Sequence, residues 1–216
     1  MVSVTSKIDC PSCKSIIYQK IDFPFAFRCS KCNNSFEVFS SEKINDLGIK
    51  YNSLNFFSLL KIGDLGRYQN KSFEIIGYVR SVNSYYISNE WMILFSDETK
   101  KWLVEVQGSY YIFDNDNKKF ITENVKFKKA ESKIKFNDKN FVINCISKQI
   151  EFLFEGQIEL NSVNPTQFFI FDMLSELGDE IATITIFDKE NVEINLGKKV
   201  NINELNLENI NNNNWL

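Results

Sequence analysis

Residues 73–113 read FEIIGYVRSVNSYYISNEWMILFSDETKKWLVEVQGSYYIF, and this stretch decides the fold. Its first segment has Phe73, Ile75 and Val79 at odd positions and more polar residues at even positions. This alternation predicts a strand with Tyr78 on the opposite face. Segment 91–95, WMILF, is apolar at every position and predicts a strand with two buried faces. Segment 101–107, KWLVEVQ, alternates again, and the residues at 96–99 and 108–109 favour turns.

The second half of the chain shows the same kind of pattern. Segments 134–136 and 141–145 predict one hairpin, with Phe141, Ile143 and Cys145 facing inward, and segments 181–187 and 192–196 predict another. The run KSFEII at 71–76 resembles KNFVIN at 139–144, which suggests a duplicated β unit. We therefore expect a mainly β protein, with an N-terminal zinc ribbon followed by antiparallel β-barrel or sandwich-like units.

Composition narrows the classes of function. The chain has 216 residues, a formal net charge of -3 and a pI near 5.2, which argues against a broad surface for nucleic acid. It has no histidine, which excludes histidine-based acid–base catalysis and nucleophile pairs. There is no apolar run long enough to span a bilayer and no secretory leader pattern, so we expect a cytoplasmic protein.

The strongest chemical motif lies at residues 10–32. Cys10 and Cys13 form one CxxC pair, and Cys29 and Cys32 form a second pair after fifteen intervening residues. Each pair can direct two sulfur atoms at one ion, and two such turns give the tetrahedral four-sulfur coordination that suits zinc. Short strands at 16–18, 25–27 and 36–39, with a turn at 22–24, complete the layout of a zinc ribbon.

Two alternatives to structural zinc remain open at this motif. The first is iron in a rubredoxin-like site, and the second is a metal-free redox pair, which would need an exposed thiol of low pKa. Lys14 and Asn33 follow the two CxxC pairs, at positions where glycine is common. Asparagine tolerates the left-handed backbone there, whereas lysine tolerates it poorly.

The chain divides into four expected parts. Residues 1–40 form the zinc ribbon. Residues 41–57 form a linker with a short helix, which Ser41 would cap and Gly48 would end. Residues 58–122 form the first β unit. Residues 123–216 form the second β unit, and its asparagine-rich tail from Asn201 is expected to be frayed.

The central motifs resemble a known family. The run from LKIGDLGRYQNKSFEIIGYVR through NEWMILFSDETKKWLVEVQGSYYIF is similar to the bacterial domain-of-unknown-function family 4178, over about residues 58–207. Lys71 departs from the family pattern, where a glycine is usual. Members often carry an N-terminal segment like a zinc ribbon, and the family has no established activity. The resemblance implies, as an expectation, a protein partner that can be membrane-associated. The matching residues are Gly63, Gly66, Phe73, Ile75, Gly77, Asn89, Glu90, Trp91, Phe95, Trp102, Leu103, Glu105, Gln107 and Gly108.

Aromatic and acidic residues of the central stretch offer a candidate ligand surface, although aromatic residues of strands commonly fill a core. An enzyme would have to use Glu90, Glu105, Asp97 or Gln107, and nothing in the sequence places these residues within reach of one another, so we expect no enzyme. The candidate surface consists of Tyr85, Tyr86, Glu90, Trp91, Trp102, Glu105 and Gln107.

The sequence therefore predicts a non-enzymatic binding or scaffold protein with a structural zinc ion. Its partner is expected to be a protein, because the acidic chain disfavours nucleic acid. The alternative is a module that senses a small molecule, a polyamine-like cation held by acidic and aromatic side chains.

Overall fold

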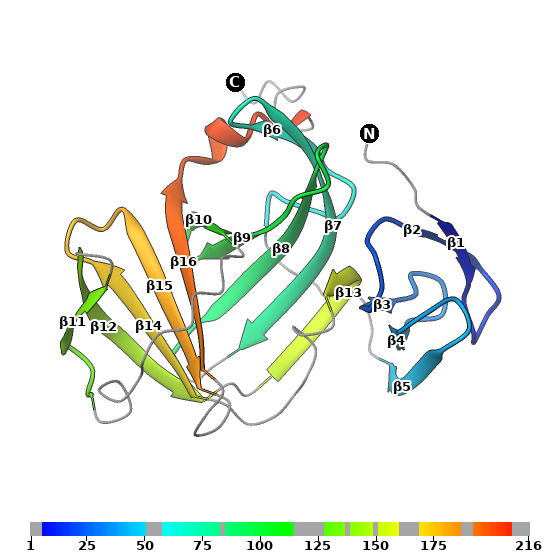
Figure 1. Ribbon diagram of the computed structural model, residues 1–216, viewed down its shortest axis with the longest axis horizontal. Helices are drawn as coiled ribbons and strands as arrows, with labels where there is room; N and C mark the ends of the chain where they lie inside the picture. The colour runs from blue at the N-terminus through cyan, green and yellow to red at the C-terminus, as the bar shows by residue number, and fades with distance from the viewer. Residues whose placement is uncertain are drawn as a thin grey trace.

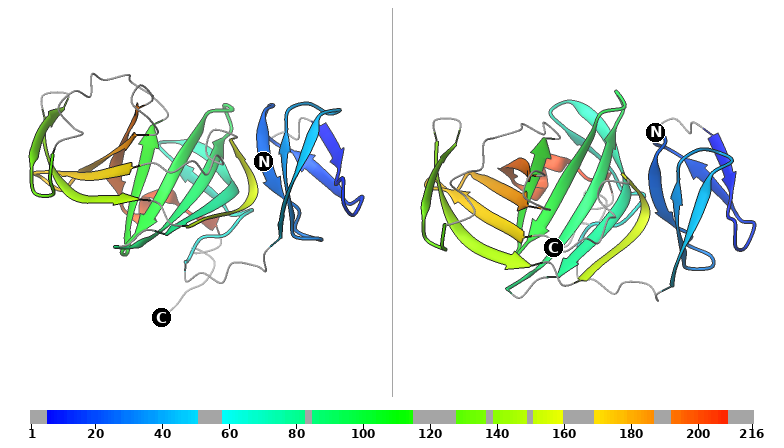
Figure 2. Two further views of the ribbon diagram at one scale, coloured as in Figure 1. Left: turned by 90° about the horizontal axis from the view of Figure 1, so that it is seen from below. Right: turned by 60° about the horizontal axis from the view of Figure 1, so that its bottom comes forward.

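The computed structural model describes residues 6–50, 58–82, 85–114, 128–136, 139–148, 151–159, 169–186 and 192–208. It confirms a mainly β protein with antiparallel strands, and a short 3-10 helix, η2 (Ile202–Leu205), lies near the end of the described chain. The N-terminal strands are β1 (Ser6–Asp9), β2 (Ile16–Gln19), β3 (Phe25–Arg28), β4 (Asn34–Val38) and β5 (Ile44–Lys50). They form a lobe at one end of the molecule (Figures 1 and 2).

The remaining strands build a curved sheet beside this lobe. In the first half of the chain they are β6 (Leu65–Tyr68), β7 (Lys71–Val82), β8 (Ile87–Phe95), β9 (Lys100–Val106) and β10 (Ser109–Asp114). In the second half they are β11 (Lys133–Phe136), β12 (Lys139–Lys148), β13 (Glu151–Glu159), β14 (Phe169–Ser175), β15 (Glu180–Ile186) and β16 (Val192–Val200). The two predicted hairpins of the second half are confirmed as β11–β12 and β15–β16.

The large sheet is open and is not a closed barrel. Its strand order is β11-β12-β14-β15-β16-β10-β9-β8-β7-β13-β3-β4-β5, and β6 pairs with β7. Strands from the two predicted β units pair with each other, β16 with β10 and β13 with β7. The boundary predicted at residues 122–123 lies outside the described residues, and the duplication stays a prediction. Because the sheet curves, the arm containing β8 faces the arm containing β14 (Figure 1).

A β-bulge in β7 changes which side chains share a face. The register with β8 shifts between Ile75 and Gly77, so one extra residue stands in β7. A bulge reverses the alternation beyond it. Tyr78 therefore joins Phe73 and Ile75 in one buried cluster, and Val79 lies in another. The prediction that Tyr78 opposes Phe73 and Ile75 is wrong for this reason.

The two buried faces of β8 are confirmed. Trp91, Ile93 and Phe95 pack in the cluster with Phe73, and Met92 and Leu94 pack in the cluster that includes the N-terminal lobe.

A second bulge, between Ile143 and Cys145 in β12, has a similar effect on the other arm. Cys145 is buried as predicted, but its side chain lies on the other face of the sheet from Ile143. Its partner in the register of β12 and β14 is Asp172.

The short helix expected within residues 41–57 is wrong, because residues 44–50 form strand β5. Val38, Glu37 and Phe36 of β4 pair with Ile44, Asn45 and Asp46. The edge of β4 offers backbone partners to every second residue, whereas a one-turn helix would leave most of its own backbone groups unpaired. The Ser40 hydroxyl accepts hydrogen bonds from the backbone N–H groups of Glu42 and Lys43 and so shapes a turn. Residues 51–57 lie outside the described chain.

The tail is ordered through its first eight residues, which corrects the expectation of fraying from Asn201 onward. Asn201 caps η2, and the Glu204 carboxylate accepts the backbone N–H of Asn201 in return. Leu205 and Leu207 are buried against the cluster that contains Trp91. Burial of two leucine side chains stabilises this end by about 1.5–3 kcal/mol each. Residues 209–216 lie outside the described chain.

The N-terminal lobe is joined to the large sheet by backbone pairing. Strand β3 pairs with β13 from Phe25↔Glu159 to Arg28↔Gly156. On its other edge β13 approaches β7 closely. Gly77 of β7 permits this approach, because a Cβ atom at that position would stand 2.1 Å from the Gln157 carbonyl oxygen of β13. The lobe is therefore the edge of the same sheet that the central stretch builds.

Candidate functional site

The two CxxC pairs occupy matching turns of the N-terminal lobe. Cys10 follows β1, and the N–H of Lys14 donates to the Cys10 carbonyl at 2.9 Å. Cys29 follows β3, and the N–H of Asn33 donates to the Cys29 carbonyl, also at 2.9 Å. Lys14 and Asn33 have φ of 59° and 60°, so both adopt the left-handed backbone expected at these positions. Lysine accepts this conformation at a cost of roughly 1 kcal/mol.

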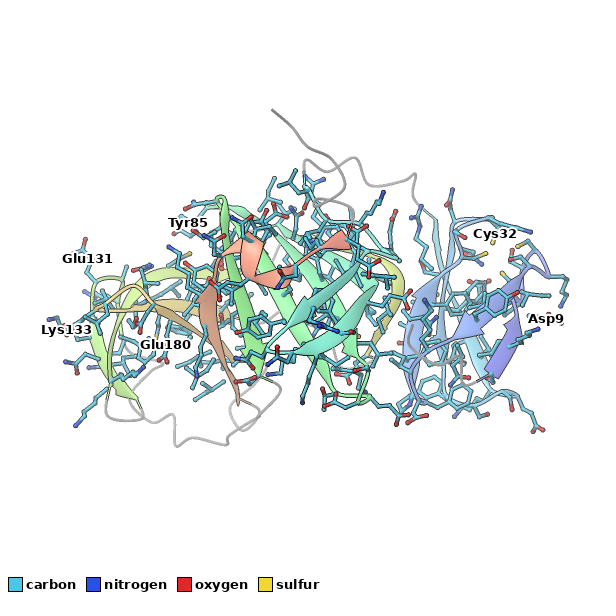
Figure 3. The ribbon with its side chains drawn as sticks, turned by 90° about the horizontal axis from the view of Figure 1, so that it is seen from above. Asp9, Cys32, Tyr85, Glu131, Lys133 and Glu180 are labelled. Carbon is cyan, nitrogen blue, oxygen red and sulfur yellow. The ribbon has the colours of Figure 1, made fainter. Side chains whose placement is uncertain are left out.

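The four sulfur atoms converge on one point. The Sγ atoms of Cys10, Cys13, Cys29 and Cys32 all lie within 4.8 Å of one another. The Cys10–Cys32 and Cys13–Cys29 sulfur pairs are each 3.7 Å apart. A tetrahedron with metal–sulfur bonds of about 2.3 Å has edges of about 3.8 Å, whereas a disulfide bond is about 2.05 Å long. The residues therefore fit one metal ion in four-sulfur coordination, a geometry open to both zinc and iron. Figure 3 shows the sulfur atoms gathered beside Cys32.

Ser15 is a contributor to this site that the sequence did not single out. Its Oγ lies 3.2 Å from the Cys13 sulfur and 3.3 Å from the Cys29 sulfur. Burial raises the pKa of Cys29, but hydrogen bonds from Ser15 and from the backbone N–H groups of Cys32 and Lys31 together bring that pKa down to about 6. Burial raises the pKa of Cys10 to about 12. A hydroxyl between two sulfur ligands can stabilise them as thiolates, the form that binds a metal.

The predicted ligand surface does not lie on one face. Trp91 is fully buried and its ring centroid lies 4.4 Å from that of Tyr78. Trp102 packs, partly buried, against the cluster that includes the N-terminal lobe. Tyr85 is 68% exposed, and Gln107 is exposed in the turn between β9 and β10 with φ of 48°. Core packing accounts for the two tryptophans, Tyr85 and Gln107 lie at the surface, and Tyr86, Glu90 and Glu105 divide between two carboxylate centres.

The first carboxylate centre surrounds Glu105. Its Oε2 accepts hydrogen bonds from Ser58 Oγ at 2.5 Å and from Asn89 Nδ2 at 3.3 Å, and its Oε1 accepts one from the Tyr110 hydroxyl at 3.2 Å. Asn89 in turn accepts the Tyr78 hydroxyl at 2.7 Å. Asn89 and Glu105 are cross-strand partners on β8 and β9. This network attaches the segment before β6 to the sheet, which is a structural role.

The second carboxylate centre surrounds Glu90, on the opposite face of β8. Glu90 pairs with Val104, and it therefore points away from its neighbour Asn89 and from Glu105. The structure does not bring Glu90 and Glu105 together. Asp97, the third acidic candidate, lies in the turn between β8 and β9, where it pairs with Lys71 at 2.5 Å. These three carboxylates form no common acid–base site.

Asp172 of β14 is the second carboxylate of the centre around Glu90, and the sequence pattern did not predict it. The hydroxyl of Tyr86 donates to Asp172 Oδ2, and Thr183 Oγ1 donates to Asp172 Oδ1 at 3.1 Å. Ser88 Oγ donates to Glu90 Oε1 at 3.1 Å. Tyr86, Ser88 and Glu90 alternate along one face, so the bond from Tyr86 places that face opposite β14. Four strands separate β8 from β14 along the sheet, and the contact closes across its concave side.

Both carboxyl groups of this centre have raised pKa values. Burial is the main cause for Glu90, and the charge of Asp172 adds to it, while hydrogen bonds from Ser81 and Ser88 oppose the shift. Burial likewise raises the pKa of Asp172 against hydrogen bonds from Tyr86 and Thr183. Burial and the charge of Asp172 also raise the pKa of the neighbouring Cys145 thiol. Enclosed carboxyl groups with shifted pKa values are typical of functional sites.

Comparison with known proteins gives one match. The family model described as Domain of unknown function (DUF4178) matches residues 61–202, inside the range of the resemblance noted from the motifs. No curated protein and no solved structure matches the chain. Among the described residues, no helix is long and apolar enough to cross a membrane.

The raised pKa values predict how stability changes with pH. A carboxyl group whose pKa is higher in the folded state favours folding when protonated, and this contribution is lost as the pH rises through the folded pKa. Glu90→Gln removes that loss while keeping an acceptor for Ser88. We expect it to raise Tm by several degrees at pH 7 and by little at pH 4, as measured by thermal unfolding.

The matched control for this pH dependence is Glu105→Gln on the other face. It replaces an oxygen that accepts hydrogen bonds with an amide donor, so it should lower Tm at both pH values. Equal effects of Glu90→Gln at pH 4 and pH 7 would contradict the assignment of a raised pKa to Glu90.

Proposed function

The chain belongs to the family described as Domain of unknown function (DUF4178), and from its own geometry we propose that it is a non-enzymatic binding protein whose four cysteines hold a structural zinc ion. The convergence of the four sulfur atoms carries this proposal. Four protein ligands complete a tetrahedral site and leave no position for a substrate. Cys10 and Cys29 are buried, which also favours a structural over a catalytic or redox role.

The zinc ribbon is fixed against the sheet by side chains as well as by β3. The Gln157 side chain accepts from the Lys20 N–H at 2.9 Å and donates to the Tyr18 carbonyl at 2.7 Å. Lys20 pairs with Glu74, and Arg28 pairs with Glu155. The ribbon therefore has a defined orientation, and its hairpin of β1 and β2 is the part left facing outward. Reduced cysteines that bind zinc suit the cytoplasm.

The outward face of that hairpin supports binding of a protein. Ile16 and Tyr18 are 56% and 51% exposed, and both lie on one face of β2. Their cross-strand partners on β1 are Asp9 and Lys7, which are also exposed. Figure 3 shows Asp9 at this outer end of the molecule. Two apolar side chains between one acid and one base suit a protein that presents an apolar side chain flanked by opposite charges. Asp9 and the negative zinc–thiolate centre disfavour nucleic acid.

A second candidate function is the sensing of a small, polyamine-like cation. The pair formed by Glu90 and Asp172 favours it, because two enclosed carboxylates attract a cationic ligand. This function depends on the concave side of the sheet and is independent of the zinc ribbon.

The metal proposal predicts about one zinc ion per chain in protein purified without chelator. Cys13→Ser should lose the metal, because three sulfur ligands hold zinc more weakly than four. Cys145→Ser should keep it, since Cys145 lies on β12, outside the ribbon. Elemental analysis measures both. Iron with visible colour, or no metal in the unaltered protein, would overturn the assignment.

The partner proposal predicts loss of binding when the ribbon hairpin becomes polar. We expect Ile16→Ser combined with Tyr18→Ser to lose proteins that crosslink to the unaltered chain in cells. A purified partner should bind this variant at least about tenfold more weakly, a difference of about 1.4 kcal/mol. Leu177→Ser is the matched control, because Leu177 is 87% exposed in the turn between β14 and β15. Equal affinity of all three proteins for the partner would remove the hairpin as its binding site.

A further inference from the structure

The concave side of the sheet carries a polar cluster that the ribbon does not use. It includes Ser88 and Glu90 from β8, Tyr86 just before β8, and Asp172 from β14. Thr183 of β15 lies beside Asp172 in the register and donates to it. The opposite side of the same strands carries Trp91 on β8 and Phe171 and Met173 on β14, and further along β8 the Glu90 side itself becomes apolar at Met92 and Leu94. The polar cluster therefore occupies the part of this side where Tyr86 of one arm reaches Asp172 of the other.

The two carboxylates of this cluster have no cationic neighbour in the described part of the chain. No lysine or arginine among those residues forms an ion pair with Glu90 or Asp172. Their neighbours are hydroxyl groups, from Ser81 and Ser88 on one side and from Tyr86 and Thr183 on the other. Enclosed negative charge without a counter-ion is unfavourable unless a proton or a bound cation neutralises it.

Ser147 on β12 gives a second, independent indication of a ligand. It is only 3% exposed, and its Oγ has no oxygen or nitrogen partner in the described chain, where the Cys145 thiol is the polar group beside it. Ser147 alternates with Cys145, and Cys145 pairs directly with Asp172, so all three side chains point to the same side of the sheet. The neighbouring Cys145 thiol is at best a weak hydrogen-bonding group. A buried hydroxyl without an oxygen or nitrogen partner usually has an unseen one, such as a ligand or water.

We propose that a small organic cation carrying ammonium groups binds on the concave side of the sheet, between Glu90 of β8 and Asp172 of β14. Ammonium N–H groups donate to both carboxylates, and the oxygen of Ser147 provides a further acceptor. Each hydroxyl that donates to a carboxylate also keeps lone pairs for the same ligand. The site deepens the second candidate function above and rests on it.

An ammonium group fits this site better than a metal ion does. Among the described residues, the only group of three or more cysteine, aspartate or glutamate ligands close enough for one ion is the four-cysteine cluster. Glu90 and Asp172 come from facing arms and supply one carboxylate each. A longer ligand with charge at separate points can reach both, whereas a calcium ion needs six to eight oxygen ligands around one point.

The test measures binding of straight-chain alkyl diamines by calorimetry, with the matching neutral diols as controls. The intact, metal-loaded protein should bind a diamine and ignore the corresponding diol. Glu90→Gln and Asp172→Asn keep side-chain size and should each weaken binding at least tenfold. Glu105→Gln should bind as the unaltered protein does, because Glu105 lies on the other side of β9. Thermal unfolding of each variant confirms that it is folded.

The outcomes separate the site from the function. Absence of diamine binding by the unaltered protein would overturn both the cation-sensing function and the site. Diamine binding that survives Glu90→Gln and Asp172→Asn would leave the function standing and overturn the site. Binding of a divalent metal ion in place of the diamine would overturn the ligand class. None of these results bears on partner binding by the ribbon hairpin.

Discussion

The pairing of β3 with β13 is the contact on which the rest of the structure depends. It makes a ribbon held by four cysteines into the edge of a sheet that the central stretch builds. Phe25, Phe27 and Phe36 of the ribbon share one buried cluster with Phe154 and Ile158 of β13. Removing the ribbon would expose both this apolar surface and the unpaired backbone of β13. Metal binding by the four cysteines would therefore be coupled to the stability of the sheet edge.

Curvature and bulges decide where the chemistry lies on the sheet. The bulge in β7 directs Tyr78 toward Trp91 and Val79 toward the ribbon side. The bulge in β12 directs Cys145 and Ser147 toward Asp172. Curvature then brings β14 opposite β8, so that Tyr86 reaches Asp172. Two carboxylates that are far apart in the sequence meet on one side, while Glu90 and Glu105, only fifteen positions apart, lie on opposite sides.

The sequence predicted those features that depend on local patterns. The spacing of Cys10, Cys13, Cys29 and Cys32 specified the sulfur cluster, and the apolar run 91–95 specified a strand buried on both faces. It did not predict the bulge in β7, because the change of parity that an extra residue causes is hidden where Ile75 and Ile76 are both apolar. It also missed β5, whose structure depends on the free edge of β4, and Asp172, whose partners come from a distant strand. Ser15 would have been found by asking which polar side chain lies next to a CxxC pair.

Hydrogen exchange of the β13 amides tests most directly whether a metal-held ribbon forms the sheet edge. With zinc bound, the backbone amides of residues 156–159 should exchange slowly, because this segment pairs with β3. After zinc is removed by a chelator, exchange there should quicken at least tenfold, while amides of β15, between β14 and β16, keep their protection. Unchanged protection of residues 156–159 in zinc-free protein would contradict the account, since β13 would then hold its edge without the metal.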